Sequence, residues 1–101
     1  MPADLEHREF LRHLNTKFMI RLSETAAVEA ELTSVSEHMV SLRQEQFSIV
    51  FRTANETFLD QGTRRFEHDQ IAAFDLFIVP IARDDQGTYY EAVFNRLTES
   101  N

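Results

Sequence analysis

The stretch from Gln61 to Arg96 reads QGTRRFEHDQIAAFDLFIVPIARDDQGTYYEAVFNR and decides the fold. It holds both glycines, both tyrosines and the most apolar run of the chain. Strand-forming residues between turn residues predict three strands, over residues 63–68, 73–82 and 88–97. We expect Gly62 and Gly87 to lie in the turns, with Gly87 in the left-handed conformation.

The middle strand of this stretch is apolar on both sides. One side carries Phe74, Leu76 and Ile78, and the other carries Phe77, Val79 and Ile81. This pattern is typical of a strand that is covered on both faces. Two alternatives follow: a fully enclosed central strand, or a strand with one face turned to a partner. Pro80 lacks an N–H group, so we expect an edge, a bulge or a strand end there.

Upstream, a helix is predicted over about residues 4–14. Apolar residues recur at spacings of three and four, with His7 on the same stripe as Phe10. Asp4 is the expected N-cap, and Asn15 is the expected stop. So short a helix must pack on the rest of the chain to be stable.

Two alternating segments follow and predict strands over residues 16–23 and 27–36. With a turn centred on Thr25, Arg21 would face Glu29 and Met19 would face Glu31, which makes the outer faces compatible in charge. The apolar sets of both strands would then meet on one face of a hairpin.

A further strand is predicted over residues 46–53, where Phe47, Ile49 and Phe51 alternate with more polar residues. We interpret residues 36–44 as a long connection that tucks Met39 and its apolar neighbours Val40 and Leu42 inward. Short links between strands favour antiparallel pairing, because parallel crossovers need long connections.

Together these elements predict one domain, residues 1–101, of the α+β class. A short N-terminal helix would precede about six antiparallel strands that form a bent meander sheet or a small open barrel. The helix would cover one face or mouth.

Composition limits the function. The 101 residues carry a net charge of −7 and no cysteine. An acidic chain argues against nucleic-acid binding, and the lack of cysteine excludes thiolate chemistry. The charged N-terminus and the lack of a long apolar run predict no signal peptide and no membrane insertion. We therefore expect a cytoplasmic protein, with export by a dedicated machine left open.

Four strings, QGT, FEH, FDLFIVPI and YYEAVFNR, together resemble the signature of a family of small bacterial proteins known only as a domain of unknown function. Arg64 and Ala73 stand where that family has tyrosine and glycine, which puts a local turn in question. The resemblance implies a neighbourhood of phage-tail-like fibre or collar proteins. It supplies no activity, cofactor or catalytic residue.

Few residues are candidates for chemistry. His68, beside Asp69, suits a metal ligand or general base, but a lone histidine more often binds backbone at a turn. Glu91, between tyrosines and apolar residues, could be an acid of raised pKa or could bind Arg64 or Arg65. The possible interaction or ligand surface comprises His68, Glu91, Tyr89, Tyr90, Phe77 and Val79. No catalytic, metal or cofactor residue is predicted.

The leading hypothesis is a non-enzymatic structural or protein-interaction module, possibly an accessory of a phage-tail-like or surface assembly. Its partner would be a second copy or another component of that assembly. The alternative is a small-ligand-binding β-barrel-like protein, with phenylalanines, Tyr89, Tyr90, His68 and Glu91 lining the mouth.

Overall fold

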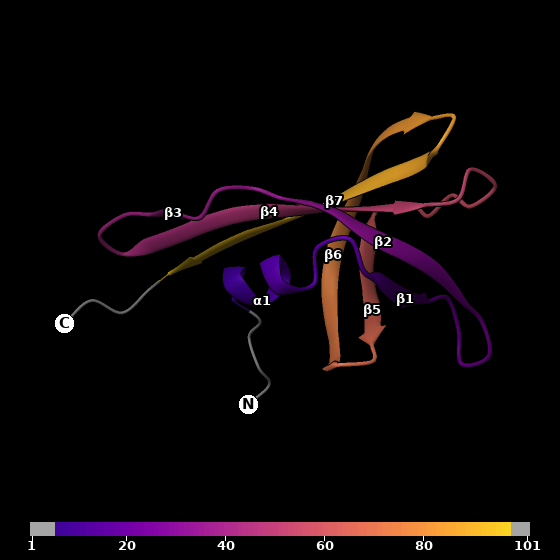
Figure 1. Ribbon diagram of the computed structural model, residues 1–101, viewed down its shortest axis with the longest axis horizontal. Helices are drawn as coiled ribbons and strands as arrows, with labels where there is room; N and C mark the ends of the chain where they lie inside the picture. The colour runs from indigo at the N-terminus through magenta and orange to yellow at the C-terminus, as the bar shows by residue number, and fades with distance from the viewer. Residues whose placement is uncertain (1–5, 98–101) are drawn as a thin grey trace.

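The computed structural model describes residues 6–97, which form one short helix and a sheet of seven antiparallel strands (Figure 1). In chain order the elements are α1 (His7–Arg12), β1 (Lys17–Arg21), β2 (Ala27–Val35), β3 (Met39–Val40), β4 (Gln44–Thr53), β5 (Gly62–His68), β6 (Ile71–Asp84) and β7 (Gly87–Leu97). The fold is therefore mostly β. The predicted α+β class gave too much weight to a helix of six residues.

The strand order is β2-β1-β5-β6-β7-β4-β3, and β2 also pairs with β4. The pairings of six strands thus return to their starting point and form a ring. A simple meander is ruled out, because β1 pairs with β5 and β4 pairs with β7 across long stretches of sequence. The antiparallel sense of every pairing was predicted correctly.

The ring is split between β6 and β7. These strands pair only from Val79↔Glu91 to Asp84↔Gly87. Beyond that point the first half of β6 pairs with β5, while the second half of β7 continues along β4. The two halves therefore diverge, as the different directions of β6 and β7 in Figure 1 show.

The helix α1 packs where the strands diverge. Its one fully buried residue, Phe10, has its ring centroid 5.4 Å from that of Phe94 on β7, 6.0 Å from Phe74 on β6 and 6.2 Å from Phe47 on β4. Phe10 thus joins β6 to the β4–β7 pair at a level where β6 no longer pairs with β7. Phe10 is the one fully buried side chain with which the helix covers this place, and His7 of the same helix packs edge-on against Phe47.

The helix is shorter than predicted. Glu6 is the N-cap residue and makes no side-chain capping bond. Asp4, the expected N-cap, lies outside the described residues. The helix ends at Arg12 with His13 as its C-cap, so the stop predicted at Asn15 lies too far along the chain; Asn15 follows in the turn with a φ of 69°, the left-handed conformation that asparagine tolerates. A six-residue helix is not stable alone and depends on its packing.

A network of aromatic rings fills the interior. Phe18 packs on Phe51, Phe51 on Phe66, and Phe66 on Phe74, which reaches Phe10. Only Phe58 and Phe77 among the phenylalanines stand exposed, at 58% and 54%. The aromatic residues therefore build the core and do not line an open mouth.

The β1–β2 hairpin has a different register from the predicted one. Met19 pairs with Glu29 and Arg21 pairs with Ala27, so the turn centres on Glu24. This shift of one residue in the turn moves the pairing by two and leaves the inward set of residues unchanged. Arg21 instead binds Glu67 of β5, with 3.1 Å between Nε and Oε1.

Within the single chain β6 is covered on one face only, which excludes the fully enclosed alternative, while a partner-facing side stays a prediction. Leu76 and Ile78 are buried, whereas Phe77 and Ile81 are about half exposed. The apolar residues on the outer side therefore do not belong to the core. The expected irregularity at Pro80 is confirmed, because the pairing with β7 shifts between Pro80 and Ala82.

Candidate functional site

His68 holds the end of β5 against the start of β1. Its Nδ1 lies 3.0 Å from the Gln70 amide nitrogen, which donates to it, and its Nε2 lies 3.0 Å from the Thr16 hydroxyl. That hydroxyl in turn donates to the His13 carbonyl oxygen at 2.7 Å. The donors and acceptors match only if Nε2 of His68 carries the proton and the ring is neutral. The structural interpretation of His68 accounts for every contact of the ring.

Burial lowers the pKa of His68 below its usual range, and the nearby His13 lowers it further. Because the folded pKa lies below the unfolded one, the unfolded chain binds a proton more readily. We therefore expect stability to fall as the pH drops through the unfolded pKa, with no further loss from this group below the folded pKa. Replacing His68 by glutamine should remove that part of the pH dependence.

The measurement is urea denaturation of wild type and H68Q at about pH 7.5 and about pH 5.5, which bracket the ordinary histidine pKa. The variant should lose less stability than wild type over this interval. Equal losses in the two proteins would contradict the assigned neutral state of His68.

Tyr90 and Tyr89 point to opposite sides of β7. Tyr90 is fully buried, and its hydroxyl oxygen accepts a hydrogen bond from the amide of Leu59 at 2.8 Å. Tyr89 is half-buried, and its hydroxyl donates to the Asp84 carboxylate at 3.1 Å. Tyr90 is thus a core residue that holds the loop between β4 and β5, and Tyr89 braces the β6–β7 turn.

We expect Tyr90→Phe to destabilise the protein by about 1–3 kcal/mol, because it leaves the buried Leu59 amide without an acceptor. Tyr89→Phe removes the matching hydroxyl at a partly exposed site and should change stability by about 0.5 kcal/mol or less. Thermal and urea denaturation of the two variants give the comparison. Equal losses for both would show that the Leu59 hydrogen bond is not stabilising.

Glu91, Phe77 and Val79 do not form one site with His68. Glu91 lies on the outer side of β7, opposite Val50 of β4 and Val79 of β6. The arginines considered as its partners bind elsewhere: Arg65 binds Asp75 at 3.2 Å, and Arg64 donates to the Asp60 carbonyl oxygen. The six predicted surface residues are therefore spread over a turn, the core and the outer face of the sheet.

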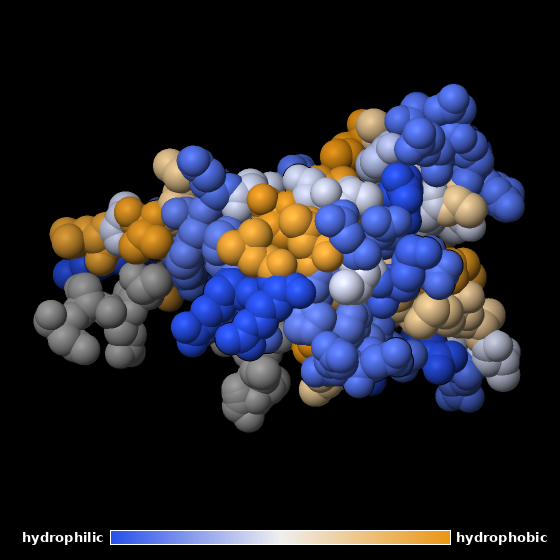
Figure 2. Space-filling model, in the orientation of Figure 1, coloured by the Kyte–Doolittle hydropathy of each residue, from blue (hydrophilic) through white to orange (hydrophobic). Residues whose placement is uncertain are grey.

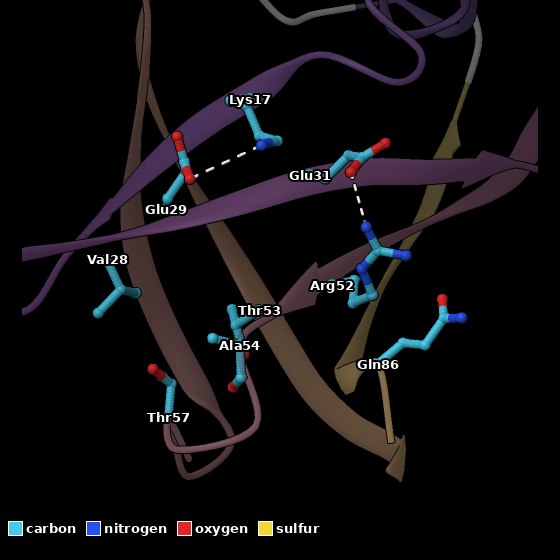
Figure 3. Close-up of a pocket in the computed structure, with 9 residues that line it drawn as sticks. All are labelled: Lys17, Val28, Glu29, Glu31, Arg52, Thr53, Ala54, Thr57 and Gln86. Carbon is cyan, nitrogen blue, oxygen red and sulfur yellow. Dashed lines mark hydrogen bonds and ion pairs between the residues drawn. The ribbon is translucent and has the colours of Figure 1, made fainter. Parts of the chain in front are cut away.

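A hollow of about 340 Å³ lies on the outside of the ring (Figure 3). Its walls carry two ion pairs, Lys17 with Glu29 at 3.7 Å and Arg52 with Glu31 at 2.7 Å. Lys17 pairs with Glu31 across β1 and β2, and Glu31 pairs with Arg52 across β2 and β4. Opposite charges thus alternate across β1, β2 and β4. These charged groups stabilise the pairing of the three strands.

The most unusual exposed feature is an arm that extends along the 47 Å long axis of the molecule (Figure 1). It consists of β3, the turn to β4, the first part of β4 (residues 44–48) and the last part of β7 (residues 93–97). It carries five exposed apolar side chains, with exposed fractions from 59% to 87%: Met39, Val40, Leu42, Val93 and Leu97. The expectation that Met39, Val40 and Leu42 turn inward was wrong.

Two histidines and an ion pair fix the base of the arm to α1. The rings of His7 on α1 and His38 before β3 stack at 4.8 Å. His38 donates to Glu45 at 2.6 Å, and Arg96 lies 3.1 Å from the other oxygen of the same carboxylate. The hydrogen bond from His38, with help from Arg96, lowers the pKa of Glu45 against the opposing effect of burial. The one acidic and one basic residue of these arm strands thus neutralise each other.

The two faces of the arm differ. On the outer face, Gln44, Gln46 and Ser48 of β4 stand beside Leu97, Asn95 and Val93 of β7. Gln44 donates a hydrogen bond from its side-chain amide to the Asn95 side-chain oxygen. No charged residue of β3, residues 44–48 or residues 93–97 lies on this outer face. In a chain of net charge −7 the outer face is neutral.

The described residues offer no ready place for a metal or a membrane span. Between residues 6 and 97, no cluster of three or more histidine, aspartate or glutamate side chains could hold a metal ion. The single helix of that same part of the chain is far too short and polar to cross a lipid bilayer.

Fold and surface together define a small, mostly β protein with a ring of antiparallel strands, a helix packed where the ring splits and a projecting arm. The chain belongs to the family described as "Domain of unknown function (DUF6916)", whose model matches residues 5–94. This confirms the resemblance to an uncharacterised family. No curated protein and no solved structure matches the chain.

Proposed function

We propose that the protein is a non-enzymatic protein-interaction module and that the arm is its contact surface. One observation carries the proposal: five apolar side chains project from two short stretches of strand and one turn, with Leu42 and Leu97 exposed by 83% and 87%. Scattered exposed apolar residues are ordinary, but apolar residues gathered on one projecting element mark a site of association. Figure 2 shows apolar colour at the end of the molecule that β3 and β4 form, and a larger apolar area over the middle of the molecule.

The surroundings of the arm support this assignment. A hollow of about 460 Å³ lies at the root of the arm, and Met39 and Val93 are among its lining residues. Apart from Phe47, the other lining residues are polar or acidic, Glu37 and Glu91 among them, so the hollow can receive a polar or basic side chain from a partner. The stacked histidines and the Glu45–Arg96 pair keep the arm in place, which lowers the entropy lost on binding.

The candidate residues for chemistry support a non-enzymatic role, because their contacts are structural. His68 is held neutral between an amide and a hydroxyl, and Tyr90 is in the core. Membership of a phage-tail-like assembly remains a proposal that rests on the resemblance of the sequence strings alone. The ligand-binding alternative is not favoured by the interior, which phenylalanine rings fill.

Photo-cross-linking in the native cell tests the proposal. A cross-linking amino acid is placed at Leu42 on the arm, at Phe77 on the outer face of β6, and at Phe58 as a control of similar exposure in a loop. We expect a discrete protein adduct, with itself or another protein, from position 42 and none from position 58. An adduct from position 77 alone would move the contact surface to β6. No adduct from 42 or 77 would overturn the proposal.

A further inference from the structure

The second half of β7 has an open edge. Its pairing with β4 runs to Leu97, whereas its pairing with β6 ends at Glu91. In the part of the chain that the structure describes, residues 92–97 therefore pair with a strand on one side only. Unpaired edges are templates for strand addition, and proteins usually protect them with charges, prolines or bulges. Residues 92–97 read AVFNRL, without proline, and their pairing with β4 is regular; their one charged residue, Arg96, forms an ion pair with Glu45 of β4.

We propose that this edge pairs with the same edge of a second copy, in antiparallel orientation, so that two sheets join through their β7 strands. The proposal rests on the proposed function and names the partner of the arm. A two-fold axis makes such a contact self-complementary, because every contact of one residue with another is repeated with the two chains exchanged, and only the residue on the axis meets its own counterpart. The remaining question is which residue lies on the axis.

The side chains favour an axis at Asn95. Val93 then stands opposite Leu97 of the second copy on the outer face, and the reverse pair forms on the other side of the axis. Each of these pairs joins two apolar side chains that are exposed in the single chain. The two Asn95 side chains meet at the axis, where amides can hydrogen-bond to each other.

The inner face fits the same register. Phe94 stands opposite Arg96 of the second copy, an arrangement that allows a cation–π contact. Arg96 already lies over the rings of Phe94 and Phe47 in its own chain, at 5.4 and 5.7 Å from the centroids. An axis at Arg96 would instead oppose two like charges, and an axis at Phe94 would oppose Val93 to Asn95. Both are poorer matches.

Charge favours a second copy as the occupant. The protein as a whole is acidic, so most of its surfaces repel another copy. This repulsion is absent between the arm strands, because their outer face is neutral and Glu45 binds Arg96 on the inner side. Along residues 93–97 two acidic chains can therefore meet without opposing like charges, and Arg43 and Glu91 lie outside this stretch.

The contact is expected to be weak. Five residues of strand edge bury less than the roughly 1,200 Å² at the low end of stable complexes. Dimers should therefore form in a concentration-dependent way. Sedimentation velocity from about 10 µM to about 500 µM covers the range in which such an interface is populated.

A charge exchange at the axis tests the register. Asn95→Asp and Asn95→Lys each place two like charges opposite each other, so each variant alone should dimerise at least about ten-fold more weakly than wild type. An equimolar mixture of the two should recover dimers, because unlike charges then meet. Gln86→Asp, at the exposed β6–β7 turn, adds the same negative charge as Asn95→Asp but away from the arm. It should dimerise like wild type. Circular dichroism checks that each variant is folded.

Wild type that stays monomeric over the whole range would overturn the inference, and so would single variants that dimerise like wild type or a mixture that recovers nothing. A failure here differs from a failure of the proposed function. If position 42 cross-links to a different protein while wild type stays monomeric, the interaction module stands and only the self-pairing is lost.

Discussion

Phe10→Ala is expected to lower the free energy of unfolding by about 3–5 kcal/mol, the range for a fully buried phenylalanine. Phe10 is 0% exposed and is in ring contact with β4, β6 and β7 at once. It fills the place where β6 and β7 separate, so its loss leaves a cavity between strands that no ladder of hydrogen bonds holds together. Because total stabilities are typically about 5–15 kcal/mol, the variant should be close to unfolding.

The matched control is Leu11→Ala, the next residue of the same helix, which is 46% exposed. It tests the helix without opening the core and should change stability by about 1 kcal/mol or less. Urea denaturation gives both values, and each kcal/mol should appear as a shift in Tm of about 4–8 °C. If the two variants unfolded alike, α1 would not be the element that closes the split.

Gly87→Ala is expected to be the second severe substitution. A Cβ at this position would lie 2.0 Å from the Thr53 carbonyl oxygen and 2.8 Å from Cγ of Arg52. The first of these atoms belongs to the backbone of β4, so a rotamer change cannot relieve the contact. We expect a loss of about 3 kcal/mol or more, at the upper end for overpacking, because β4 and β7 must separate near their last pair.

Gly62→Ala is the matched control for this contact. Gly62 has nearly the same φ, 158° against 153°, but nothing lies within 4 Å of its added Cβ. The backbone strain of the two substitutions is therefore similar, and the difference in unfolding free energy isolates the clash at Thr53. Similar losses for both glycines would show that φ and not the close approach requires glycine at residue 87.

The role of Gly87 also shows where prediction from sequence reached its limit. Its place in a turn was predicted correctly, but its φ of 153° is not the left-handed conformation that was expected. The reason for the glycine is the approach of β4, which is 34 residues earlier in the chain. A turn motif carries no information about a strand that packs from so far away.

Periodicity predicted the strands well, because it reports which residues face the core. All six predicted strands exist, and the helix lies inside its predicted range. Pairing was predicted less well. The contacts of β1 with β5 and of β4 with β7 are non-local, and alternation says nothing about which strand lies alongside which.

The arm was missed for a related reason. Met39, Val40 and Leu42 are apolar, and the ordinary expectation for apolar residues is burial. The segment was too short to show alternation, so β3 gave no strand signal. The strand predicted over residues 46–53 also began too late, because β4 begins at Gln44 and pairs with β7 as far as Leu97.

For the candidate residues too, local contacts were predicted better than contacts between distant parts of the chain. The structural interpretation of His68 agrees with its contacts, which lie close to it in sequence or at the neighbouring start of β1. The grouping of His68 with Glu91 and the tyrosines rested on an expected barrel mouth, and the structure instead places His68 at the end of β5 and Tyr90 in the core. Neighbouring strand residues point to opposite faces, as Tyr89 and Tyr90 do.

Amide hydrogen exchange of residues 92–97 tests most directly whether the arm is a contact surface used by a second copy. Peptides that cover the second half of β7 are compared at low and high protein concentration, with peptides from β5 as the internal reference. Self-pairing predicts that exchange in residues 92–97 slows as concentration rises, while the β5 peptides do not change. Equal exchange of residues 92–97 at both concentrations, under conditions where the protein is folded, would contradict it.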